Sequence, residues 1–147
     1  MNILLINQEH PLWEKAAEFA QNCSWKAGQF LAERMRKNGF RDWERVIIAM
    51  DDEQIAGFCT LTEKDALPDD ALFSPFIGFV FVDEQYRGNR LSEQMIRSAC
   101  GYAKESGCQA VYIVSGEQGL YEKYGFEKIG DYETIYGTTE QLFQIAV

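Results

Sequence analysis

The stretch from Ile77 to Glu93 constrains the fold of this chain more than any other. It opens with an unbroken apolar run, Ile77–Val82, that is rich in Val and Phe. A run this short, with that composition, is typical of a strand buried on both faces. A polar turn follows at Tyr86–Arg90, and a helix is predicted to begin at about Leu91. The stretch therefore predicts a central strand that passes through a short turn directly into a helix.

This turn has the features of an anion-binding turn. A Gly-containing turn between a strand and a helix directs several backbone N–H groups at one point, with the positive end of the helix dipole behind them. That arrangement can hold a phosphate or pyrophosphate. Arg87 and Arg90 add positive charge, and Gly88 lets the backbone approach a ligand closely. Taken alone, the segment fits an ordinary strand–helix connection equally well.

The remaining pattern predicts the element order β, α, α, β, β, β, α, β, α, β, β, which is a mixed sheet flanked by helices. The fold class is α+β (an α/β mixed sheet), and 147 residues suit one domain, 1–147. The other predicted strands are Ile3–Ile6, Val46–Met50, Ile55–Thr62, Ala110–Val114 and a last β region at Phe126–Gly130, Glu133–Tyr136 and Gln141–Ala146. The predicted helices are Leu12–Cys23, a second one capped by Ser24 and stopped at Gly39, a third from Leu91 to Gly107, and Leu120–Tyr124. Between two strands, the polar loop Thr62–Pro75 is long enough to be functional.

Charge and cysteine content exclude several classes of function. A net charge of −9 disfavours a general nucleic-acid binder and favours a cationic acceptor such as an amine. Four cysteines without a CxxC pair, and a single histidine, predict no metal site and reduced thiols of a cytoplasmic protein. No apolar run is long enough for a transmembrane helix, so no membrane partner is expected. A homodimer is left open, because small domains of this kind commonly pair.

Two segments resemble the GNAT superfamily of N-acetyltransferases. The first, RGNRLS at Arg87–Ser92, is similar to the acetyl-CoA pyrophosphate loop of that family, Q/R-x-x-G-x-G/A, although Arg90 and Ser92 replace its small residues. The second, LYEKYGFEKIG at Leu120–Gly130, is similar to the C-terminal LYEKxGF signature. The two segments occur in the order of the family and at about its separation, and the element order also matches.

The resemblance implies a GNAT-like fold and an enzyme, an acetyl-CoA-dependent N-acetyltransferase with acetyl-CoA as its cosubstrate. The acetyl group would pass to a primary amine, either a small amine or a peptide amine, by direct attack in a ternary complex. The central strand would bind the pantetheine arm and the turn would bind the pyrophosphate. The implied cofactor-binding residues are Val80, Phe81, Val82, Arg87, Gly88, Asn89, Arg90, Leu91 and Ser92. The alternative left open is a non-catalytic CoA-binding sensor or interaction domain of the same fold.

Catalytic roles also follow from the resemblance. Tyr121 matches the general acid that protonates the departing CoA thiolate, although Tyr121 and Tyr124 could instead be packing aromatics. Glu84 and Glu117 are the candidates for removing the proton of the acceptor amine, directly or through water, and either could be a solvated turn residue. The predicted catalytic pair is Tyr121 and Glu84.

The three tryptophans have two possible roles. Trp13, Trp25 and Trp43 lie in or beside the N-terminal helical region, which walls the acceptor site in this family. Core packing is the expected role of at least two of them.

Overall fold

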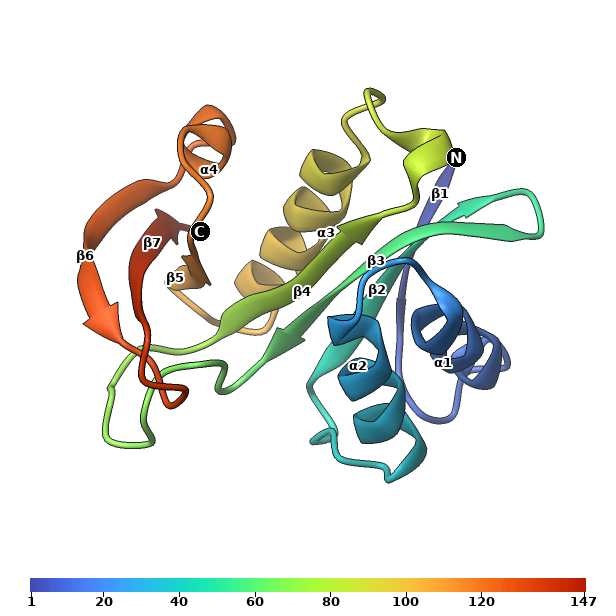
Figure 1. Cartoon of the computed structure of the whole chain (residues 1–147), viewed down its shortest axis with the longest axis horizontal. Coiled ribbons are helices and arrows are strands. Elements are labelled where there is room, and N and C mark those ends of the chain that lie inside the picture. The colour runs from blue at the N-terminus through green and yellow to red at the C-terminus, as the bar shows by residue number, and fades with distance from the viewer.

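A seven-stranded mixed sheet runs through the protein, and the computed structural model describes residues 1–147 (Figure 1). The strands lie in the order β1-β2-β3-β4-β5-β7-β6. They are β1 (Asn2–Ile6), β2 (Arg45–Asp51), β3 (Gln54–Thr62), β4 (Phe76–Val82), β5 (Ala110–Ser115), β6 (Glu127–Glu133) and β7 (Thr139–Ala146). The helices are α1 (Trp13–Asn22), α2 (Ala27–Arg36), the short 3-10 helix η1 (Glu84–Tyr86), α3 (Leu91–Glu105) and α4 (Leu120–Lys123).

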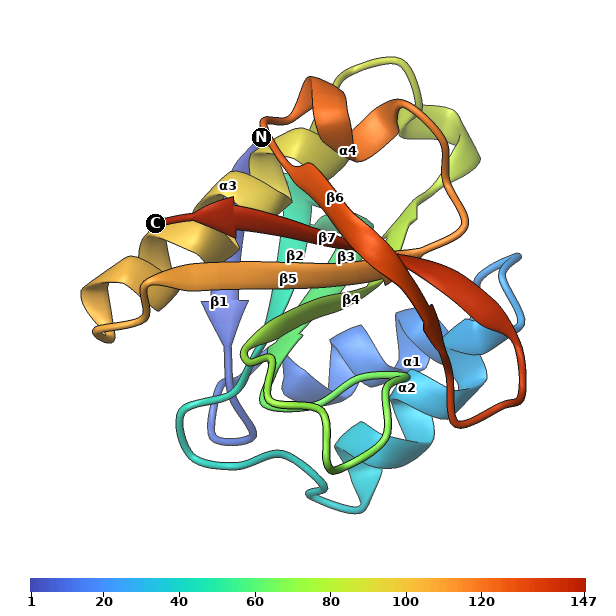
Figure 2. The same ribbon diagram turned by 90° about the vertical axis from the view of Figure 1, so that its left-hand side faces the viewer.

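Strand directions divide the sheet into two parts. The strands β1 to β4 pair antiparallel with their neighbours, and β5, β7 and β6 form a second antiparallel group. The two groups meet at β4 and β5, which are parallel and connected through α3. A parallel pair needs such a crossover, and a helix is its usual form. In Figure 2, β5 and β7 run across the direction of β1, β2 and β3.

Helices cover both faces of the sheet. The pair α1 and α2 lies on one face and α3 on the other (Figure 1). Successive residues of β2 show the alternation, because Ile47 packs in the core under α3 and Ile48 in the core under α1 and α2. Both side chains are fully buried, as expected for a central strand that is covered on both faces.

The two groups of strands diverge almost as soon as they meet. The only paired residues between β4 and β5 are Phe76 and Tyr112. Farther along β4, Phe79 has a φ of 50°, and the register against β3 shifts between Phe58 and Thr60. This irregularity is a bulge, and bulges bend a strand and end regular pairing. The rest of β4 therefore leaves its edge toward β5 without a partner strand.

Two predicted boundaries are wrong, one because of a long-range contact and the other because of a local turn. Ser24 does not cap α2, which begins at Ala27, and its hydroxyl instead bonds the carboxylate of Glu84. The region Glu133–Tyr136 is not a strand beyond Glu133, because the chain turns there. The turn is closed by a hydrogen bond from the Thr134 N–H to the Thr138 carbonyl at 2.7 Å.

No helix of the structure combines the length and apolar character that crossing a membrane requires.

Candidate active site

The turn before α3 presents a row of free backbone donors. None of the N–H groups from Gly88 to Glu93 donates a hydrogen bond within the chain. They lie at the N-terminus of a 15-residue helix, where the helix dipole adds positive potential. Gly88 has a φ of +88°, and a Cβ built there would meet no atom within 4 Å. The turn thus fits a phosphate group, which such amides bind well.

Gly88 provides a direct test of this turn. We expect Gly88→Ala to lower the free energy of unfolding by about 1–2 kcal/mol, because a Cβ disfavours positive φ. Acetyl-CoA binding should weaken as well, because the added methyl group projects into the open space of the turn.

The matched control is Gly101→Ala, an exposed position within α3 that also has open space around it. At that position alanine should raise the free energy of unfolding by about 0.5–1 kcal/mol, because alanine has a higher helix propensity than glycine. Urea unfolding and calorimetry with acetyl-CoA measure both quantities. Equal behaviour of the two variants would contradict the proposed role of Gly88.

The side chain of Arg90 does not fill this turn. It is 73% exposed and forms an ion pair with Glu93 at 2.8 Å. Its backbone adopts the left-handed conformation, with φ 59°, which a glycine adopts without steric cost. The departure from the small residue of the family pattern therefore leaves the amides accessible.

The other residues predicted in the turn hold it in place. Asn89 Nδ2 donates to the Tyr86 carbonyl at 3.0 Å, and the hydroxyls of Ser92 and Tyr124 are 2.7 Å apart. Tyr124 thus connects α4 to the start of α3. Leu91, the first residue of α3, is buried in the core under that helix.

A cleft of about 380 Å³ connects this turn with the unpaired edge of β4. Four of its lining residues are predicted cofactor-binding residues, namely Val80, Phe81, Val82 and Arg87. Arg87 Nε donates to the Val82 carbonyl at 3.1 Å, so the guanidinium lies across the end of β4. An unpaired strand edge can accept an extended ligand as an added strand, and the amides of a pantetheine arm have that form.

A second cavity, of about 370 Å³, opens where β4 and β5 diverge; we call it the strand cavity. It shares Trp25, Val80 and Glu117 with the cleft, so the two spaces adjoin. Its remaining lining is mostly apolar, with Tyr121 of α4 on one side and Asp65 of the loop before β4. A linear ligand could therefore extend from the turn, along β4, to the strand cavity.

Tyr121 is the predicted acid, and the structure places it in the wall of the strand cavity. Its ring packs against Phe143 with a centroid separation of 5.6 Å, and the residue is 5% exposed. Burial raises the pKa of Tyr121 to about 12, while the nearby Ser115 side chain acts in the opposite direction. The phenol therefore keeps its proton at neutral pH and can donate it.

The structure separates the two predicted glutamates. Glu84 lies on η1 with its side chain 59% exposed, bonded to Ser24 and 3.8 Å from Arg87, and it lines neither the cleft nor the strand cavity. Glu117 follows β5 and lines both spaces. The structure thus brings Glu117, and not Glu84, together with Tyr121.

Asp65 is the site residue that sequence reasoning missed. Its carboxylate lies against β4, so that a Cβ on Gly78 would be 3.2 Å from Oδ2. Burial raises its pKa to about 6, although Arg34 and the Ala66 amide oppose that shift. The length of the polar loop Thr62–Pro75 was the one sequence signal at this position.

Two of the three tryptophans pack in the core, as expected, and the third lines the site. Trp13 is buried, and its Nε1 donates to the Met35 carbonyl at 3.1 Å. Trp43 packs against the core under α3. Trp25 is the tryptophan that lines the cleft and the strand cavity.

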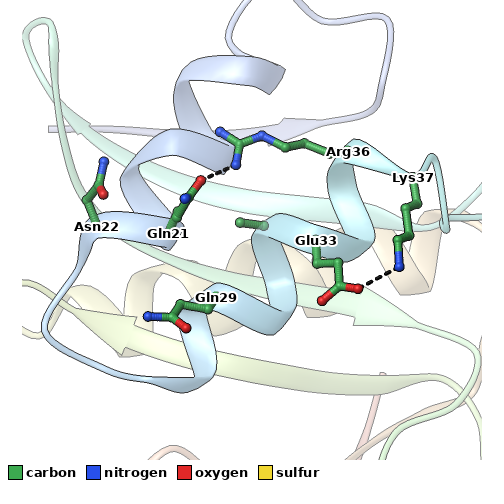
Figure 3. A pocket seen from close by; sticks show the side chains of 7 residues that line it. Gln21, Asn22, Gln29, Glu33, Arg36 and Lys37 are labelled. Atoms are coloured by element: carbon green, nitrogen blue, oxygen red, sulfur yellow. Dashed lines mark hydrogen bonds and ion pairs between the residues drawn. The ribbon is translucent and has the colours of Figure 1, made fainter.

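A separate polar depression lies between α1 and α2 (Figure 3). Its charged side chains are satisfied locally, because Arg36 bonds Gln21 and Lys37 pairs with Glu33 at 2.5 Å. It shares no residue with the strand cavity. The structure also contains no group of three or more His, Cys, Asp or Glu side chains arranged to hold a metal ion.

The fold and this site define an acetyltransferase of the GNAT type, and comparison with known proteins agrees. The sequence profile of the Acetyltransferase (GNAT) family matches residues 10–126. The chain belongs to this family. The predicted enzyme class, an acetyltransferase that uses acetyl-CoA as cosubstrate, is thereby confirmed, as are the fold class and the resemblance.

Individual relatives support the assignment. The chain is 30% identical over 120 residues to the uncharacterized N-acetyltransferase YhbS of Escherichia coli K12, covering 78% of this chain and 68% of that protein. A crystal structure of E. coli YhbS in complex with CoA has a TM-score of 0.70 at 24% identity, over 97% of this chain and 80% of that one. An aminoglycoside 6'-acetyltransferase type Ii has a TM-score of 0.76 at 13% identity, over 99% and 97% of the two chains. These two structural similarities establish the fold.

Proposed function

We propose that this protein transfers the acetyl group of acetyl-CoA to a primary amine by direct attack within a ternary complex. The observation that carries the proposal is that the cleft and the strand cavity adjoin. Arg87, beside the free amides of Gly88–Glu93, lines the cleft, and Tyr121 lines the strand cavity. The resulting path has an anion-binding end, an unpaired strand edge and a proton donor, in the order that acetyl-CoA requires.

The donor would be held along this path. The pyrophosphate would accept hydrogen bonds from the amides around Gly88 and Ser92. The pantetheine amides would pair with the β4 edge from Val80 to Val82, which would lay the thioester between β4 and Tyr121. A backbone N–H of β4 near Val80, which lines both the cleft and the strand cavity, would stabilise the oxyanion that develops on the thioester carbonyl, and such a donor is worth roughly 3 kcal/mol. Arg87 would leave the Val82 carbonyl and pair with a phosphate.

The reaction then needs three proton transfers, the first of which removes a proton from the incoming ammonium. The neutral amine attacks the carbonyl carbon, the C–N bond forms, and the C–S bond breaks as Tyr121 gives its proton to the sulfur. The nitrogen, which carries an extra proton after the attack, returns a proton to Tyr121. Glu84 remains a predicted proton acceptor for the incoming ammonium, and slower turnover of Glu84→Gln would support that role.

The experiment is direct. Purified protein, acetyl-CoA and a panel of small primary amines should release free CoA thiol, which a thiol reagent detects. We expect thiol release that depends on the amine. Folded protein that binds CoA in calorimetry, but releases no thiol with any amine, would contradict the proposal and favour a CoA-binding domain without catalysis.

A further inference from the structure

We propose that Asp65 receives the acceptor amine: its carboxylate binds the incoming ammonium in the strand cavity and accepts its proton before the attack. This inference rests on the proposed function, and it gives Asp65 the proton-accepting role that was predicted for Glu84, which lines neither the cleft nor the strand cavity. The acceptor class that follows is a small primary ammonium on an apolar body.

The position of Asp65 is fixed by the loop on either side of it. Thr62 Oγ1 donates to the Lys64 carbonyl at 2.7 Å, and the Ala66 carbonyl accepts from the Ile135 N–H at 2.8 Å. Leu67 is buried against Phe76 and Leu142. Because these contacts hold the loop on both sides of Asp65, the loop loses little conformational freedom when the carboxylate binds a ligand.

The contact with Gly78 sets the carboxylate at the point of divergence. Gly78 is the last β4 residue paired with β3 before the bulge at Phe79. The absence of a side chain there lets the Asp65 carboxylate lie on the strand itself, because a Cβ at Gly78 would be closer to Oδ2 than ordinary van der Waals contact allows. Asp65 thus faces the same cavity as Tyr121, across the space where β4 and β5 separate.

No cationic side chain lies within ion-pair distance of the Asp65 carboxylate. It forms no ion pair, and no Lys, Arg or His lines the strand cavity. Arg34 acts on it electrostatically, but that guanidinium is engaged with Glu44 at 3.5 Å and with the Gly39 carbonyl at 3.0 Å. The other ionisable groups that face the cavity are Glu117, Tyr121 and Tyr136, none of which is a cation at neutral pH. A largely buried carboxylate of this kind is stabilised when a cation binds beside it.

The other residues that line the strand cavity determine which amines fit into it. Trp25 and Tyr136 line it with aromatic rings, and Tyr136 is 76% exposed at its rim. Ammonium groups are attracted to aromatic faces as well as to carboxylates. A volume of about 370 Å³ is near the small end of ligand pockets, which suits a small amine better than an extended peptide.

The proton transfer balances. An alkylammonium gives one proton to the Asp65 carboxylate, and the resulting neutral amine attacks the thioester. Asp65 passes this proton to water, so each turnover releases one proton in addition to the CoA thiol. With a pKa raised to about 6, Asp65 is ionised at neutral pH yet a stronger base than an ordinary aspartate.

Two isomeric probe amines and one substitution test the inference. The probe 2-phenylethylamine is protonated at neutral pH, as lysine is, whereas 4-ethylaniline is already neutral. For Asp65→Asn, we expect kcat/KM for 2-phenylethylamine to fall about 100-fold at pH 7, while kcat/KM for 4-ethylaniline stays the same. The penalty should shrink as pH rises and free alkylamine accumulates. Asp70→Asn, at an exposed position of the same loop, should match the wild type with both amines.

A binding measurement separates this inference from the proposed function. Calorimetry of 2-phenylethylamine with the CoA-loaded protein should show binding that Asp65→Asn weakens about tenfold or more. If the wild type releases no thiol but this loss of binding is seen, the acetyl-transfer proposal fails for these amines and the role of Asp65 as the ammonium site stands. If the wild type turns over and Asp65→Asn loses nothing, or loses equally with both amines, the role of Asp65 is overturned. Absence of ammonium binding to the wild type would overturn it as well.

Discussion

Tyr121→Phe is expected to lower kcat about 100-fold while leaving the KM for acetyl-CoA nearly unchanged. General acid catalysis contributes about 10²–10⁴ in rate. The lower end applies here because a thiolate, with a reference pKa of about 8.5, is already a fair leaving group. The phenylalanine keeps the ring contact with Phe143, so binding and folding should persist. Steady-state kinetics with a saturating amine measures the effect.

The pKa of Tyr121 adds a second observable to this experiment. Because burial raises that pKa to about 12, the phenol should stay protonated throughout the usual assay range. The wild-type kcat should therefore show no alkaline loss that can be assigned to Tyr121 below about pH 10.

Tyr102→Phe is the matched control for Tyr121→Phe. It removes a tyrosine hydroxyl that donates to the Trp43 carbonyl at 2.7 Å, and Tyr102 lines neither the cleft nor the strand cavity. It should cost about 1 kcal/mol of stability and leave kcat unchanged. A Tyr121→Phe enzyme that turns over at the wild-type rate would exclude Tyr121 as the acid.

Asp65→Asn is expected to stabilise the protein at neutral pH, by up to about 3 kcal/mol. The pKa of Asp65 rises from 3.8 to about 6 on folding, and one pKa unit corresponds to about 1.4 kcal/mol. The folded state therefore holds the proton more tightly, and stability falls as pH rises between those two values. Asparagine removes the ionisable group and with it this loss. For a chain of this length, Tm at pH 7.5 should rise by roughly 5–10 °C.

The pH dependence distinguishes this effect from a general improvement in packing. At pH 5 the advantage of Asp65→Asn should be about half that at pH 7.5, because part of the wild-type Asp65 is then protonated. Asp70→Asn should change stability little at either pH, since Asp70 is exposed. Thermal and urea unfolding at both pH values provide the comparison. An advantage that does not vary with pH would argue against a desolvated carboxylate at position 65.

Local sequence features predicted well the part of the site that is assigned to acetyl-CoA. The run Ile77–Val82, the turn at Gly88 and the helix from Leu91 are contiguous, so their geometry follows from neighbouring residues and all three lie where expected. The Leu120–Gly130 segment likewise identified Tyr121, which lines the strand cavity.

The acceptor side depended on contacts between distant residues. Asp65 meets Gly78 and shares a cavity with Tyr121, more than fifty positions later, and no local pattern encodes such a meeting. The two glutamates were equivalent as turn residues in the sequence. Only the packed structure assigned Glu117 to the cavity and Glu84 to Ser24 and Arg87. The same long-range bond explains why Ser24 does not cap α2.

The sequence by itself determined the strand, turn and helix that form an anion-binding end, together with the family to which they belong. These depend on apolar periodicity, a glycine and adjacent residues, all of which act within a few positions. The tertiary structure alone decided where β4 leaves β5, because that separation arises from a bulge against β3 and a single pair between Phe76 and Tyr112. The cavity opens at this separation, and the residues that line it come from the start of α2, the loop before β4, β4, β5 with the turn after it, α4 and the turn before β7.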